Sequence, residues 1–176
     1  MEHLITLEDF KTLARPASIH LDEAHVMAYV REAEDAYIIP AIGYGTFKDI
    51  KQYDVTRPLN PMPKELRILW EGGEYTPQAC GCDDQTLQYC KGLKLTVAYY
   101  AYAKMIRADG SIVSRSGFMR HEDDYSRHVD DTALKQYNDV MDIAERYLAS
   151  CLAYLQTLQP TKPVHGTRAR IYAIGD

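Results

Sequence analysis

Hydrophobic residues in this chain are spaced mostly as they are in amphipathic helices. Between residues 22 and 39, apolar side chains recur at three- and four-residue intervals, which places them on one helical face, and charged residues fall on the opposite side. The apolar positions are Val26, Val30, Ala33 and Tyr37, and the charged ones are Arg31, Glu32, Glu34 and Asp35. This pattern predicts a helix that Asp22 caps and that Pro40 and Gly43 end.

The two longest predicted helices have wider apolar faces. Residues 86–108 are apolar almost all round, which is typical of a helix at the centre of a bundle or of one covered by another subunit. Residues 131–156 carry an apolar stripe with further apolar residues at heptad spacing beside it. The stripe consists of Leu134, Tyr137, Met141, Ala144, Leu148, Cys151 and Leu155.

Shorter helices are predicted over residues 7–13, 46–53 and 64–70. The first is predicted because Thr6, with Asp9 three positions later, resembles a capping box. The segments between the helices are expected to be irregular. They are the proline-containing connector 54–63 and the loop 74–85.

Two segments lose the helical spacing. Glycine, serine and charged residues surround Ile112 and Val113 in the segment 109–129, which predicts an extended arm or a small hairpin. The tail 157–176 is expected to be irregular, although its arginines alternate with apolar residues as in a terminal strand. We therefore predict an all-α single domain over residues 1–176, a small helical bundle with its core at about residues 6–156.

The length, composition and net charge of the chain exclude several classes of protein. The 176 residues suit one domain, and 46% hydrophobic with 26% charged residues excludes wholesale disorder. A net charge of −5 argues against a protein whose main task is to grip nucleic acid. The longest apolar stretch, residues 93–106, contains two lysines and is too short to span a membrane, and residues 1–10 do not resemble a signal peptide, so we expect a soluble protein made in the cytosol.

The cysteines raise the question of a metal site. Cys80 and Cys82 are followed by Cys90, and thiolates are preferred zinc ligands. The first pair is separated by one residue rather than two, and the fourth ligand would have to be a distant histidine or Cys151. The spacing favours a glycine-containing turn over a metal site.

A second polar cluster consists of His121, Glu122 and Asp123, with His128 further on. The spacing of seven between the histidines differs from the metalloprotease pattern, so a solvated polar arm is favoured. The sequence has no nucleophile elbow, phosphate loop or dinucleotide fingerprint. We therefore expect no catalytic residue, cofactor or metal, and a protein that is not an enzyme.

Tyrosine is over-represented, with 14 residues against three Phe and one Trp. Tyr99, Tyr100 and Tyr102 point in different directions around the helix predicted over residues 86–108, so they cannot all face one internal core. Tyrosine is enriched at protein interfaces because its large ring ends in a polar group. A subunit interface and a core with hydroxyl groups at its rim both remain open.

The order of several segments resembles a known family. The segments are Thr6-Leu7-Glu8-Asp9-Phe10-Lys11, Glu32-Ala33-Glu34, Tyr37-Ile38, Pro40-Ala41-Ile42-Gly43, Leu69-Trp70-Glu71-Gly72-Gly73-Glu74-Tyr75, Gly92-Leu93-Lys94 and Ala98-Tyr99-Tyr100-Ala101-Tyr102-Ala103. Over about residues 4–155, the chain resembles the small α-helical head–tail connector (adaptor) proteins of tailed phages, in the form found in phages and prophages of Bacteroides-type bacteria.

The resemblance implies a structural virion component made in the bacterial cytoplasm. Such adaptors form a ring, commonly twelve-fold, between the portal protein and the tail-completion proteins, and DNA passes through without sequence-specific binding. The net negative charge is compatible with such a channel. The residues expected at subunit contacts are Tyr99, Tyr100, Tyr102, Ile112, Val113, Arg168, Arg170, Ile171 and Tyr172.

Two other functions stay open on the sequence. One is a cytosolic helical module that binds a protein partner through its tyrosine-rich helix. The other is a metal-binding enzyme that uses Cys80, Cys82 and Cys90, or His121, Glu122 and Asp123.

Overall fold

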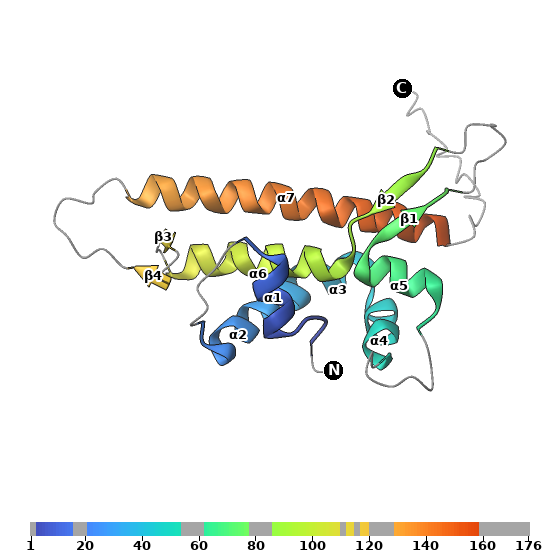
Figure 1. Ribbon diagram of the computed structural model, residues 1–176, viewed down its shortest axis with the longest axis horizontal. Helices are drawn as coiled ribbons and strands as arrows, with labels where there is room; N and C mark the ends of the chain where they lie inside the picture. Colours follow the sequence, from blue (N-terminus) through green and yellow to red (C-terminus); the bar gives the residue numbers. More distant parts are fainter. Residues whose placement is uncertain are drawn as a thin grey trace, which may run out of the picture.

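Two long helices, α6 (Leu93–Asp109) and α7 (Val129–Leu158), run antiparallel along the length of the molecule (Figure 1). They pack on each other more extensively than any other pair of elements. This computed structural model is mostly helical, which confirms the predicted all-α bundle. It describes residues 3–15, 21–53, 62–77, 86–109, 112–114, 117–119 and 129–158.

The amino-terminal helices cover α6 on the side away from α7 (Figure 1). They are α1 (Leu7–Leu13) and α2 (Glu23–Ala33), and both pack on α6. The α1 boundaries are those predicted, and the Thr6–Asp9 capping box is complete because each side chain accepts from the other residue's backbone N–H.

The helix α6 is at the centre of the bundle. Its buried residues point in every direction around the axis, because α7 covers one side and the amino-terminal helices cover the other. These residues are Leu93, Val97, Ala98, Tyr100, Ala101, Tyr102, Ala103, Met105 and Ile106. Of the two explanations for an apolar helix, the described elements support a central position in the chain's own bundle.

The helix predicted to end at Pro40 continues past it. After α2 comes a π-helical turn (η1, Glu34–Ile38), in which the Ile39 N–H bonds the Glu34 carbonyl, and then α3 (Ile39–Ile42). Proline lacks an N–H and clashes with the carbonyl four residues earlier, and the wider turn removes that conflict. The prediction was wrong for Pro40 and right for Gly43, whose φ of +82° ends the helix.

Two further helices lie near the end of the bundle where α6 begins (Figure 1). They are α4 (Tyr44–Gln52) and α5 (Lys64–Glu71), and both match the predicted helices within two residues. Pro63 stands at the start of α5, where a missing N–H does no harm.

A small hairpin replaces the first turns predicted for the helix 86–108. β1 (Gly73–Tyr75) pairs antiparallel with β2 (Gln88–Cys90), so α6 begins at Leu93 and not at residue 86. The prediction also missed β1, which lies in the segment read as a loop. Gly92 makes the turn from β2 into α6 with a φ of +85°. A run of three residues is too short for periodicity to distinguish a strand from a helix start.

A second hairpin lies at the opposite end of the long helices (Figure 1). β3 (Ile112–Ser114) pairs antiparallel with β4 (Gly117–Met119), which agrees with the hairpin form of the predicted arm. The rest of the arm, the connector 54–61 and the tail after Leu158 lie outside the described residues. Within the described stretches, no helix is long and apolar enough to cross a membrane.

We predict that Gly92→Ala destabilises the fold by about 2 kcal/mol or more, because alanine is strained at this φ and its Cβ would lie 2.5 Å from the Gly72 nitrogen. Gly45→Ala is the matched control, since nothing lies within 4 Å of its added Cβ and alanine favours helix. Urea unfolding of both variants tests this. Equal midpoints for the two variants would contradict the prediction.

Candidate functional site

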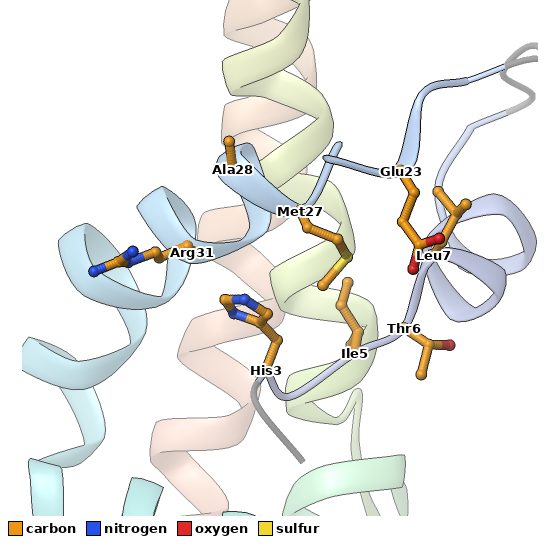
Figure 2. A pocket seen from close by; sticks show the side chains of 8 residues that line it. All are labelled: His3, Ile5, Thr6, Leu7, Glu23, Met27, Ala28 and Arg31. Atoms are coloured by element: carbon orange, nitrogen blue, oxygen red, sulfur yellow. The ribbon is translucent and has the colours of Figure 1, made fainter. Parts of the chain in front are cut away.

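A groove lies between the amino-terminal segment and α2 (Figure 2). Its volume is about 440 Å³. Ile5 and Met27 lie in the middle of it, with His3 and Arg31 toward one end and Glu23 toward the other. The groove therefore offers an apolar centre between groups of opposite charge.

A second hollow of about 490 Å³ adjoins the first and shares Thr6, Leu7 and Glu23 with it. It adds Glu8 and Lys11 from α1. Together the two hollows form a continuous surface that could hold a short peptide segment through apolar contacts and ion pairs.

Glu34 fixes the segment that forms one wall of the groove. Its carboxylate accepts the Leu4 N–H and lies 3.1 Å from His3 Nδ1. The Trp70 indole N–H donates to the Leu4 carbonyl at 3.2 Å. Leu4 and Ile5 are buried as a result. Two hydrogen bonds on one residue thus attach the amino-terminal segment to both α5 and the turn after α2.

The placement of Glu34 corrects the sequence prediction. It was expected on the exposed charged side, together with Arg31, Glu32 and Asp35, but only 3% of it is exposed. Glu34 follows Val30 by four residues, so it lies at the edge of the buried face, and the amino-terminal segment covers it. A helical pattern cannot show this cover, because the segment comes from thirty residues earlier in the chain.

The tyrosines predicted at a subunit interface lie mostly inside the chain's own core. Tyr100 and Tyr102 are 2% and 6% exposed, so neither offers a surface to a neighbour, and the interface prediction is wrong for both. The Tyr100 ring stacks on Tyr37 with a centroid distance of 4.3 Å, and Tyr102 packs against Phe10. Cover from η1 and α1 explains how these two tyrosines, on different sides of α6, both become buried.

Tyr99 is half-buried and packs edge-on against Tyr147 of α7, with a centroid distance of 5.1 Å. Burial raises the pKa of the Tyr99 phenol, and it raises the pKa of Tyr100 to about 12. The negative charge of Glu145 adds to the rise at Tyr100. These phenols therefore stay protonated well above neutral pH.

The other predicted contact residues have no described side-chain environment. Ile112 and Val113 lie in β3, opposite Met119 and Phe118 in the hairpin register. The four tail residues lie outside the described residues, and they are Arg168, Arg170, Ile171 and Tyr172.

The structure describes only some of the candidate metal ligands. Cys80 and Cys82 lie outside the described residues, as do His121, Glu122 and Asp123. Cys90 is buried, and its sulfur lies 3.9 Å from that of Cys151. Among the side chains that the structure describes, no three His, Cys, Asp or Glu residues are grouped so as to hold a metal ion.

A row of apolar side chains on α7 remains partly uncovered. Leu134 is 58% exposed, and Met141, Leu148 and Leu155 are half-buried. We call these four residues the α7 row. The predicted stripe contains them, but the buried centre of the face lies at Val140, Ala144, Cys151 and Tyr154, so the row forms one flank of the helix. The predicted stripe was the sequence signal for these residues, and only the position of α6 shows which part of the stripe is buried and which part is left at the flank.

Comparison with known proteins gives one match. Residues 38–161 match a family described as "Family of unknown function (DUF6712)", which is more than two thirds of the chain. No curated protein and no solved structure matches. The matched range includes α6, α7 and the cysteine pair, whereas the residues that line the groove precede it.

We predict that Glu34→Ala lowers the free energy of unfolding by about 1–3 kcal/mol, because the buried Leu4 N–H loses its acceptor. Glu32→Ala is the matched control, since it removes only an exposed carboxylate 3.7 Å from Lys104, a pair worth less than about 1 kcal/mol. Denaturant unfolding measures both variants. A loss in Glu34→Ala no larger than in the control would show that this carboxylate does not hold the segment.

We also predict an alkaline loss of stability that depends on Tyr100. The folded state holds its phenol proton up to about pH 12, whereas the unfolded chain releases it near the ordinary value of 10.0. This contribution is therefore complete below pH 10 and is lost as the pH rises toward 12, by roughly 2 kcal/mol.

Unfolding midpoints on either side of pH 10 test this prediction in the wild type and in Tyr100→Phe. The variant should lose less stability with rising pH than the wild type. Tyr44→Phe removes a hydroxyl from a side chain that is 66% exposed and should behave like the wild type. Identical pH profiles for all three proteins would refute the assignment.

Proposed function

The chain belongs to the DUF6712 family, whose function is unknown, and we propose that it is a structural head–tail connector of a tailed phage or prophage. In this proposal, copies of the chain form a ring between the portal protein and the tail, and DNA passes through the ring without sequence-specific binding. The protein is made in the bacterial cytoplasm and ends in the virion. It has no catalytic role.

The observation that carries the proposal is the α7 row. Seven residues bring an α-helix back to within about 20° of its starting direction, so Leu134, Met141, Leu148 and Leu155 follow one another along one flank. The row is roughly 30 Å long at 1.5 Å per residue. Met141, Leu148 and Leu155 pack in part on the chain's own core, and what they and Leu134 leave uncovered is an apolar strip that a second protein could cover.

A second copy of the chain is the partner that the row favours. In a closed ring, each subunit presents one surface to the neighbour on one side and a different surface to the neighbour on the other. The row would then be covered once in every subunit. The β3–β4 hairpin lies at the end of the α6–α7 pair, where it could contact a neighbour (Figure 1). The family resemblance in the sequence supports the same assembly.

The groove between the amino-terminal segment and α2 favours a second candidate, a helical module that binds one protein partner. Its apolar centre and charged ends suit a peptide that carries both apolar and charged side chains. Burial of Tyr100 and Tyr102 removes the tyrosine-rich helix as the contact surface in this candidate. The groove would have to take its place.

We expect the purified protein to form a ring, alone at high concentration or together with the portal protein encoded in the same genome. Leu148→Glu should weaken this assembly at least about tenfold, because a carboxylate would have to be buried in an apolar contact. Light scattering gives the mass of the assembly, and electron microscopy of stained particles shows its symmetry.

Ala153→Glu is the matched control, because it adds the same charge to an exposed position on a side of α7 well away from the row. This variant should assemble like the wild type. A wild-type chain that stays monomeric with and without the portal protein would refute the connector proposal. A monomer that captures a peptide in the groove would instead support the second candidate.

A further inference from the structure

Two cysteines that are distant in sequence face each other inside the protein. Cys90 is the last residue of β2, and Cys151 lies in α7, 61 positions further along the chain. Their sulfur atoms are 3.9 Å apart, and both residues are completely buried. The Cys90 thiol is placed to donate a hydrogen bond to the Cys151 sulfur.

The surroundings of the two sulfurs differ, and they shift the pKa values of the two thiols in opposite directions. The hydroxyl of Thr96, a residue in the first turns of α6, lies 3.8 Å from the Cys151 sulfur. The hydrogen bond from Cys90 lowers the pKa of Cys151, and Thr96, the Gly92 backbone and Ser150 lower it further against the effect of burial. The same contact, together with burial, raises the pKa of Cys90. Cys151 is therefore the sulfur that becomes a thiolate first.

We propose that Cys90 and Cys151 form an oxidative modification site, a dithiol that a small-molecule disulfide converts into an intramolecular disulfide bond. The Cys151 thiolate attacks one sulfur of the small disulfide and releases one thiol, which leaves a mixed disulfide on Cys151. Cys90 then loses its proton, attacks the Cys151 sulfur and releases the second thiol. Two protein thiols are oxidised, and one disulfide is reduced to two thiols.

The distance between the two sulfurs is compatible with this bond. The sulfurs must approach from 3.9 Å to about 2.05 Å, which is a movement of roughly 2 Å along a line that the hydrogen bond already defines. A small disulfide reaches them when the β1–β2 hairpin opens. That hairpin has three-residue strands, and Tyr89 beside Cys90 is 55% exposed, so local opening requires the loss of few contacts.

The bond would fasten β2 to α7. The hairpin already meets α7 through the Tyr75 and Tyr154 rings, whose centroids are 4.7 Å apart. A covalent link across 61 residues restricts the unfolded chain and therefore stabilises the folded one. The two thiols stay reduced in a reducing compartment and form the disulfide in an oxidising one. This inference is independent of the proposed connector function.

The test uses the full-length double variant C80S/C82S, in which Cys90 and Cys151 are the remaining cysteines. The folded protein is incubated with oxidised glutathione and digested without reduction, and the peptides are analysed by mass spectrometry. We expect a Cys90–Cys151 linked peptide and a rise in Tm of roughly 5–10 °C. Dithiothreitol should reverse both changes.

The triple variant C80S/C82S/C151S is the control and should show neither the link nor the rise in Tm. If that variant does not fold, the oxidised and reduced forms of C80S/C82S still provide the comparison, because they have the same sequence. The urea-unfolded C80S/C82S chain shows whether the same oxidant can form the link at all. If the unfolded chain forms it, the proposal fails when the folded protein keeps two thiols or stops at a glutathione mixed disulfide.

Discussion

The fold depends on covering one helix on all sides. α6 is apolar around almost its whole circumference, and the hydrophobic effect penalises any face left in water. One neighbouring helix can cover only one side, so α7 and the amino-terminal helices must share the task. The Glu34 carboxylate and the Trp70 indole hold the amino-terminal segment in place, which keeps the second side of α6 closed.

The same constraint determines which surfaces remain available. Because α1 and α2 pack mainly on α6, α7 keeps a partly uncovered flank with the α7 row on it. The groove forms where the amino-terminal segment passes α2, with the side chains of Ile5 and Met27 next to each other in its middle (Figure 2). Both candidate binding surfaces are therefore consequences of how α6 is covered.

Assembly and oxidation would act on different parts of this architecture. The row lies along the flank of α7, whereas the cysteine pair joins α7 to the β1–β2 hairpin inside the protein. A ring contact would bury apolar side chains that the chain itself covers only in part. A disulfide would add a covalent link to a hairpin that now meets α7 through the Tyr75–Tyr154 ring contact and the buried Cys90. Each can be tested without the other, because they share no side chain.

The sequence by itself determined the helical class, most helix positions and the capping box, because these depend on local spacing and on Thr6, Asp9, Pro63 and Gly43. Only the tertiary structure decided that Tyr100 and Glu34 are buried and that Cys90 meets Cys151. These outcomes depend on which distant segment packs over each residue. Periodicity reports which face of a helix is apolar, but it carries no information about what covers that face.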